Sequence, residues 1–217
     1  MENTNYTNEN SNSSFSENFK DFYKNDFKNL LLTIFKNPTE GVHSIFVNST
    51  RGSYRNSLVL YVSIIILYLA EIYLILGDAS EYLQFSQLLR VSLIPAIFMF
   101  IISAISFGIK SVSSKPSFKS ELLTGGLCAI PIGTLMTLIL LLKIFGTLED
   151  VNDIYRNPLE SGFLVILVLL YVFLILTNIL QQSLKSSGTK DAIAWYLSPI
   201  AILAASYITY QVSKELF

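Results

Sequence analysis

Charged residues are scarce in this chain. Of its 217 residues, 14% are Asp, Glu, Lys or Arg, whereas a soluble domain carries about 25%. The formal net charge is −1, and no basic stripe indicates a nucleic-acid-binding surface. Hydrophobic residues account for 52% of the sequence, and the mean hydropathy is +0.51. This composition argues against a soluble globule or a disordered regulator and predicts a membrane protein.

Cysteine and histidine each occur once. Cys128 cannot form a disulfide within the chain, and its apolar neighbours indicate a small buried side chain. His43 alone cannot build a zinc site of the His type or a catalytic His pair. The sequence also lacks a glycine-rich phosphate loop and a nucleophile-elbow serine. We therefore expect no enzymatic activity, no metal, no cofactor and no small-molecule substrate.

Five stretches are long and apolar enough to cross a bilayer, whose core of about 30 Å needs about 20 helical residues. The predicted spans are 57–77, 88–109, 122–145, 162–184 and 192–212. We therefore predict an all-α fold, a polytopic membrane helix bundle of five transmembrane helices preceded by an amphipathic helix. The bundle occupies residues 57–212, and residues 213–217 form a short outer tail.

Lysine and arginine near the span ends indicate the orientation. With the N-terminus inside, the inner side receives Lys36, Arg51, Arg55, Lys110, Lys115, Lys119, Lys185 and Lys190. The outer side receives Arg90, Lys143, Arg156 and Lys214. The excess of positive charge on the inner side favours an N-in, C-out topology.

The segment before the first span has two parts. Residues 1–18 are rich in Asn and Ser, and we predict that they form a disordered tail. Residues 19–56 are predicted to form an amphipathic helix and a short helix, capped by Asn37, on the inner face. The apolar side of the amphipathic helix carries Phe19, Phe22, Phe27 and Ile34. We expect it to lie in the membrane interface; the alternative is a helix packed on the bundle or on a partner.

Small residues recur every four positions in the third span. They are Gly125, Ala129 and Gly133. Such a face lets another helix approach closely. The second and fifth spans carry similar small residues, and Pro95, Pro131 and Pro199 lie inside the same three spans. We expect these three helices to be central and the first and fourth to face more lipid. The prolines are interpreted as shaping the bundle, with a hinge or a substrate cavity as the alternative.

Ionisable residues are almost absent from the predicted spans. Glu71 and Arg90 lie near the outer ends of the first and second spans. We expect them to form a structural pair, and a proton or ion site is the alternative. Asn178, Gln181 and Gln182 gather at the inner end of the fourth span, where we expect hydrogen bonds to neighbouring helices.

The order of these elements carries a family resemblance. The segment Phe35-Lys36-Asn37-Pro38-Thr39-Glu40-Gly41-Val42 precedes five closely spaced spans. Over about residues 30–212 the chain resembles the Yip-domain (Ypt/Rab-interacting) family in its bacterial form. The resemblance implies a non-enzymatic protein of the bacterial cytoplasmic (inner) membrane that organises membrane or partner proteins. The Asp-Leu-Tyr-Gly-Pro type element of eukaryotic members is missing, so no binding residue is carried over.

Two functions fit these features. The first is a membrane scaffold or adaptor that contacts the bilayer and a protein partner, or a second copy of the chain. The second is a small transport component, or the membrane subunit of a larger transporter, that uses Glu71 and Arg90. A transporter needs a polar cavity reaching the middle of the membrane. A scaffold predicts a dry bundle with a polar or grooved inner face.

Overall fold

The computed structural model describes residues 15–48, 51–76, 84–112, 114–145 and 161–216. Within these ranges the chain forms helices and turns, and no residue belongs to a strand. The predicted disordered tail lies outside the described residues up to position 14. Its last four residues, 15–18, belong to a helix instead.

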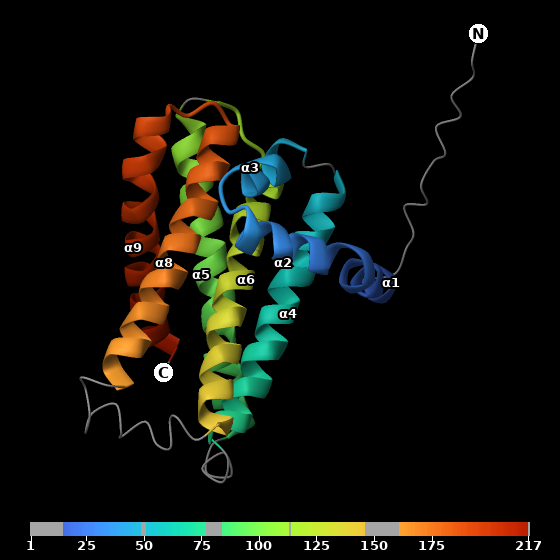
Figure 1. The fold of residues 1–217 in the computed structure, drawn as a ribbon, viewed down its shortest axis with the longest axis vertical. Helices are drawn as coiled ribbons and strands as arrows, with labels where there is room; N and C mark the ends of the chain where they lie inside the picture. Colours follow the sequence, from blue (N-terminus) through green and yellow to red (C-terminus); the bar gives the residue numbers. More distant parts are fainter. Residues whose placement is uncertain (1–14, 49–50, 77–83, 113, 146–160, 217) are drawn as a thin grey trace.

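Five long helices form the body of the protein (Figure 1). They are α4 (Arg51–Leu76), α5 (Phe85–Ser111), α6 (Phe118–Ile144), α8 (Ser161–Ser186) and α9 (Asp191–Leu216). Each is long and apolar enough to cross a membrane. The prediction of five transmembrane helices in an all-α bundle is therefore confirmed, and the chain is an integral multi-pass membrane protein. The tail predicted from residue 213 instead continues α9 to Leu216.

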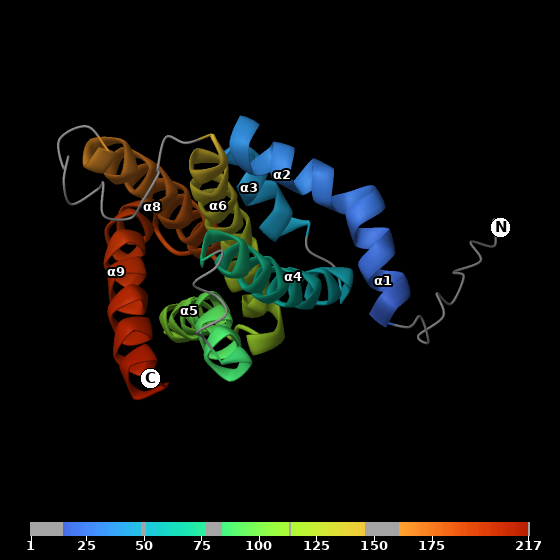
Figure 2. The same ribbon diagram turned by 90° about the horizontal axis from the view of Figure 1, so that it is seen from below.

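The end-on view shows how the five helices are arranged (Figure 2). Helix α6 packs on α4, α5 and α8, and it is the most buried of the five spans. Helix α9 packs mainly on α5 and α8, so the prediction that it is central is wrong. The fourth span, α8, is more buried than expected because the short helix α3 (Glu40–Val47) covers one of its ends. We call this end of the bundle the α3 end.

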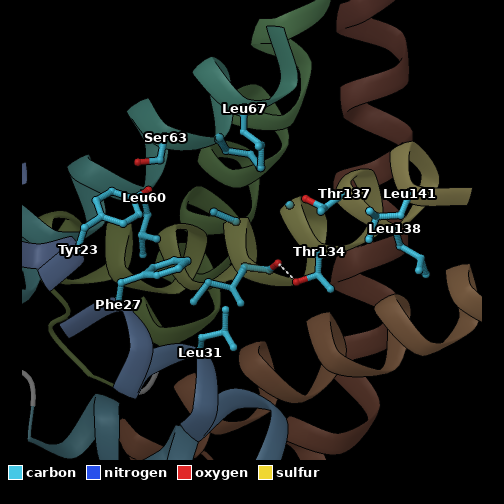
Figure 3. Close-up of a pocket in the computed structure, with 14 residues that line it drawn as sticks. Tyr23, Phe27, Leu31, Leu60, Ser63, Leu67, Thr134, Thr137, Leu138 and Leu141 are labelled. Carbon is cyan, nitrogen blue, oxygen red and sulfur yellow. Dashed lines mark hydrogen bonds between the residues drawn. The ribbon is translucent and has the colours of Figure 1, made fainter. Parts of the chain in front are cut away.

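The amino-terminal segment crosses the bundle near the α3 end (Figure 1). It comprises α1 (Phe15–Asp21), the π-helical turn η1 (Phe22–Asp26) and α2 (Phe27–Lys36). Phe22 and Ile34 are 1% and 0% exposed, and Phe19 and Phe27 pack against the same core. Tyr23, Phe27 and Leu31 lie beside α4 and α6 (Figure 3). The apolar face therefore packs on the bundle, as the alternative interpretation holds, and contact with the membrane surface stays a prediction.

The turn between α2 and α3 differs from the prediction. Asn37 ends α2, donating its backbone N–H to the Thr33 carbonyl oxygen at 3.0 Å, and so it does not cap α3. Thr39 precedes α3 and makes no capping hydrogen bond through its side chain. The corner is tight because Gly41 packs against Thr33, where an added Cβ would lie 2.7 Å from the Thr33 methyl carbon. Asn37 therefore belongs to the end of α2 rather than to the start of α3.

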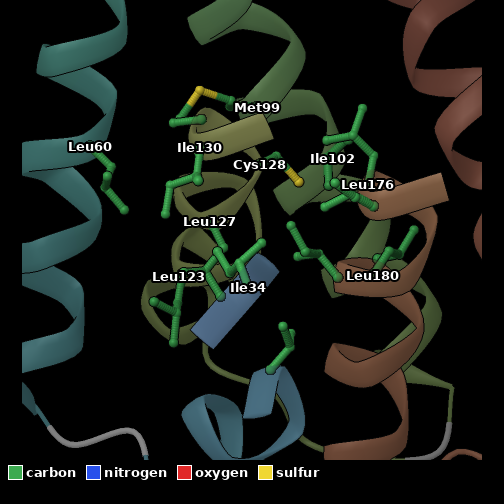
Figure 4. Close-up of a cluster of buried hydrophobic side chains, with 14 of the residues drawn as sticks. Ile34, Leu60, Met99, Ile102, Leu123, Leu127, Cys128, Ile130, Leu176 and Leu180 are labelled. Carbon is green, nitrogen blue, oxygen red and sulfur yellow. The ribbon is translucent and has the colours of Figure 1, made fainter. Parts of the chain in front are cut away.

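The core lies between α4, α5, α6 and α8, and Ile34 of α2 reaches into it (Figure 4). Its buried side chains include Leu60, Met99, Ile102, Leu127 and Leu180. Cys128 is fully buried among them, as predicted, and its thiol donates to the Thr124 carbonyl oxygen at 3.3 Å. Since lipid tails are as apolar as these residues, close packing rather than the hydrophobic effect holds the helices together.

Candidate functional site: a polar groove at the α3 end

A polar groove lies at the α3 end, between α3, α8 and α9. Its volume is about 860 Å³. It is lined by Thr39, Glu40, His43, Ser44, Val47, Asn48, Gln181, Gln182, Lys185, Asp191 and Trp195. Both charge signs, three amide side chains and an indole ring therefore share one concave surface.

The charged and aromatic groups of the groove are accessible. Lys185 and Asp191 form an ion pair at 3.3 Å, and the Asp191 side chain is 81% exposed. Trp195 is 60% exposed. The Nδ1 atom of His43 is buried and has no hydrogen-bond partner within the described residues. An exposed aromatic residue beside mixed charges is typical of a surface that binds protein.

Hydrogen bonds from α8 hold one wall of the groove in place. The side-chain amide of Asn178 donates to the Pro38 carbonyl oxygen, which lies just before α3. The amide of Gln182 donates to the side-chain oxygen of Asn178 at 3.2 Å. The expected hydrogen bonds to neighbouring helices are therefore not what these contacts show: Asn178 bonds to the turn between α2 and α3, Gln182 bonds within α8, and Gln181 lines the groove.

A buried ion pair lies behind the groove. The ammonium group of Lys110 lies 2.8 Å from a Glu121 carboxylate oxygen, and it also donates to the Ser183 hydroxyl at 2.8 Å. The Ser106 hydroxyl donates to the Glu121 carboxylate at 2.7 Å. The ring of Phe46, from α3, lies 5.9 Å from the Lys110 nitrogen. The cluster therefore links α5, α6 and α8, and α3 closes it.

The sequence alone does not reveal this cluster: it gives Lys110 an inner-side position near a span end and no partner. The sequence nevertheless contains a signal for this ion pair, in the positions of its two members at helix ends. Lys110 lies in the last turn of α5 and Glu121 in the first turn of α6. A cation at a helix C-terminus and an anion at a helix N-terminus both interact favourably with the helix dipole. The polar segment between the two helices brings these ends together.

Glu71 and Arg90 do not form the expected pair. The Glu71 side chain is 2% exposed and accepts a hydrogen bond from the Thr137 hydroxyl of α6 at 2.9 Å. Its second oxygen, Oε2, has no hydrogen-bond partner within the described residues. Arg90 is exposed and donates to the Leu216 carbonyl oxygen of α9 at 3.2 Å. Each side chain thus finds a partner on another helix because α6 and α9 pack beside α4 and α5.

The small-residue face of α6 lies where two helices approach it. A Cβ on Gly125 would overlap the backbone oxygen of Met99 on α5 and the Tyr61 hydroxyl of α4. Ala129 is buried. A Cβ on Gly133 would lie 3.2 Å from the Leu67 side chain of α4. These residues therefore face α4 and α5.

Three cavities at the depth of the spans have a different character, because mainly apolar side chains line them. A lateral groove of about 400 Å³ lies between α4, α6 and the amino-terminal helices. A second cavity of about 240 Å³ lies between α6 and α8, and a third of about 560 Å³ is lined by residues of all five long helices. In the third, the hydroxyls of Ser206, Thr209 and Ser213 donate to carbonyl oxygens of their own helix.

No group of three His, Cys, Asp or Glu residues that could hold a metal ion occurs in the part of the chain that the structure describes. Comparison with protein-family models, curated proteins and solved structures finds no match.

Proposed function

We propose that the chain is a non-enzymatic integral membrane scaffold or adaptor that binds a protein partner in the polar groove at the α3 end. One contrast supports this proposal above all. The groove at the α3 end offers charges, amides and an exposed Trp195, whereas the three cavities at span depth have mainly apolar walls. A scaffold needs a polar surface outside the bilayer, and a transporter needs polar groups within it.

The proposal places the α3 end at the cytoplasmic side of a bacterial inner membrane, with the N-terminus inside and the C-terminus outside. Lys115, Lys119, Lys185 and Lys190 all belong to turns or helix ends at the α3 end, which agrees with the rule that positive charge stays inside. The resemblance to the Yip-domain family is consistent with such a role. In this arrangement the groove faces the compartment in which soluble partners are found.

Site-specific photo-crosslinking in living cells tests the groove. A crosslinking amino acid replaces Ser44, which is exposed and lines the groove, or Lys115, which is exposed at the same end but does not line it. We expect one protein adduct of defined mass from position 44 and none from position 115. Reversing the charge of the groove wall with Glu40→Lys should weaken that adduct. Equal adducts from both positions would contradict the proposal.

The amino-terminal arm can be tested separately. Deletion of residues 1–14 leaves every described helix intact. If the arm helps to capture the partner, the adduct at position 44 becomes weaker in the deletion variant. An unchanged adduct would contradict a role of the arm in capture and would leave the groove as the binding surface.

The second candidate function, a transport component, has one observation in its favour. Glu71 is buried inside a predicted span, and its Oε2 atom has no hydrogen-bond partner within the described residues. An ionisable group at such a place is a candidate for ion or proton transfer. Arg90 takes no part in this candidate transport function, because it is exposed and donates a hydrogen bond to the Leu216 carbonyl oxygen.

Glu71→Gln separates the two functions. Glutamine keeps an oxygen that can accept the hydrogen bond from Thr137 but cannot carry a proton. In proteoliposomes, a transporter that depends on Glu71 should lose proton-coupled flux, while the matched control Thr137→Val should retain it. Equal flux in the native chain and in Glu71→Gln would rule out ion coupling at this residue.

A further inference from the structure

Helix α8 is tightly packed over only one half of its length. The half nearer the α3 end contributes Ile179, Leu180 and Leu184 to the core, each of them 0% exposed. In the other half, the structure describes the side chains of residues 163 and 166–171, and all of these except Val168 are exposed. We call residues 163–171 the α8 arm. The arm leans away from α6 as the distance from the α3 end increases (Figure 1).

Cavities lie on two sides of the arm. The second cavity, between α6 and α8, is lined by Leu167, Val168 and Tyr171 of the arm. The third cavity is lined by Leu169 of the arm and, on α9, by residues that include Thr209. Helices in a membrane are held together by close van der Waals contact, and a cavity removes such contacts. The arm is therefore held less firmly than the rest of α8.

Polar contacts fix the other half of α8 at the α3 end. The Ser183 hydroxyl accepts a hydrogen bond from the Lys110 ammonium group at 2.8 Å and lies 2.6 Å from the Thr124 hydroxyl. Asn178 donates to the Pro38 carbonyl oxygen. These contacts join α8 to α5, α6 and the turn before α3. A movement of α8 against its neighbours must therefore take place in the arm, which is about 14 Å long.

The helices that face the arm contain prolines beside the same cavities. Pro131 of α6 lines the second cavity, and Pro95 of α5 lines the third. The packing of α6 changes at its proline: residues 123–131 are all buried, whereas Gly133 is the only buried residue among those described from 132 to 145. Proline removes a backbone hydrogen bond, and helix kinks occur mostly at such positions. Both facing helices can therefore bend towards the arm.

We propose that the α8 arm and the facing halves of α5 and α6 form a gate, which is open in this structure and closes over the second and third cavities while the α3 end stays fixed. Closure replaces the two cavities by contact between apolar walls. A bend of about 20° over an arm of about 14 Å moves its tip by about 5 Å. The gate lies at the opposite end of α8 from the polar groove and does not depend on the adaptor function.

Distances between spin labels test the gate. In a Cys128→Ala background, one pair of labels is attached at Leu141→Cys of α6 and Leu170→Cys of the arm. A control pair at Lys119→Cys and Lys190→Cys reports on the α3 end, and all four positions are exposed. Double electron–electron resonance is measured on the full chain in lipid nanodiscs. We expect two distances about 5 Å apart from the first pair and one distance from the control pair.

Two results of this measurement would overturn the proposal. A single distance from both pairs would show that the arm is fixed. Two distances from both pairs would show that the whole bundle is loose and that the α3 end is no fixed base.

A wedge in the second cavity tests the direction of the movement. Val168→Phe places a ring between the arm and α6 and should abolish the shorter distance. The matched control Leu174→Phe adds the same ring at an exposed position of α8 that lines neither cavity, and it should leave both distances unchanged. Val168→Leu is the smaller wedge if the ring prevents folding. An undiminished shorter distance in the wedge variant that folds would contradict closure over this cavity.

Discussion

The ammonium group of Lys110 and the carboxylate of Glu121 lie 2.8 Å apart in the interior of the bundle, with side chains only 6% and 4% exposed. Ser183, from α8, accepts a further hydrogen bond from the ammonium group. The ion pair and the hydrogen bond together join α5, α6 and α8 at the α3 end. Removal of one member of such a pair leaves an uncompensated charge in the interior.

Removing one member of the pair should strongly destabilise the protein. Lys110→Met leaves the Glu121 carboxylate buried and without its cation, and loss of one partner of a buried pair costs about 3–5 kcal/mol. We expect the free energy of unfolding to fall by about this amount in denaturant titrations in detergent. The same measurement on Lys119→Met, an exposed lysine of α6, should show little change.

The double variant Lys110→Met with Glu121→Leu distinguishes a missing charge from a packing defect. Replacing a buried ion pair by apolar residues is often neutral, so the double variant should recover most of the stability lost in Lys110→Met. A double variant as unstable as the single one would show that packing, not the unpaired charge, causes the loss.

Asn178→Ala should loosen α3 without unfolding the bundle. The variant loses the hydrogen bond to the Pro38 carbonyl, and a typical hydrogen bond contributes about 1 kcal/mol. Hydrogen–deuterium exchange of the α3 amides, followed by mass spectrometry, should therefore become about fivefold faster. Gln181→Ala is the matched control on the same helix face of the groove. Unchanged exchange in α3 would mean that other contacts hold it.

The sequence predicts the spans well because runs of about 20 apolar residues have few other structures available. The expected start of the fifth span, residue 192, lies one residue from the start of α9 at Asp191. The apolar face of the amino-terminal helix is also visible in the spacing of Phe22 and Ile34, and both are buried. Spacing alone does not reveal whether such a face contacts lipid or the bundle, because lipid tails and the core of the bundle are both apolar.

The polar contacts were harder to predict because they join residues far apart in the chain. Glu71 has Thr137 as its partner, 66 positions away, and Asn178 binds Pro38 over 140 positions. These partners are set by which helices pack together, and small residues in α9 wrongly indicated a central helix. The packing of α4 on α6 brings Glu71 to Thr137, and the packing of α3 on α8 brings Asn178 to Pro38.

Two helical glycines should respond in opposite ways to the same substitution. Gly125→Ala forces a methyl group into the Met99 carbonyl and the Tyr61 hydroxyl, and overpacking costs about 1–3 kcal/mol or more. Gly108→Ala, in α5, meets no atom within 4 Å and should stabilise the helix by up to about 1 kcal/mol. Thermal unfolding of the two variants in detergent checks both signs. Equal melting temperatures would contradict the close approach of α5 and α6 at Gly125.

Cysteine labelling can test the orientation of the protein in the membrane. The only native thiol, Cys128, is fully buried, so a Cys128→Ala parent provides a silent background for single new cysteines. Ser117→Cys places a thiol at the α3 end, and Glu215→Cys places one near the end of α9, at the opposite end of the bundle; both positions are exposed. With the N-terminus inside, a membrane-impermeant maleimide should label position 215 in intact spheroplasts and position 117 only after permeabilisation.

The two cysteine variants serve as controls for each other, because both must be labelled once the membrane is opened. Labelling of position 117 alone in intact spheroplasts would reverse the orientation and place the polar groove outside the cell. Labelling of both positions before permeabilisation would contradict the five-span topology, since three of its crossings, α6, α8 and α9, separate the two positions and put them on opposite sides. The expected pattern leaves the polar groove in the cytoplasm, where a crosslinked adduct at position 44 must then be a cytoplasmic or membrane-bound protein.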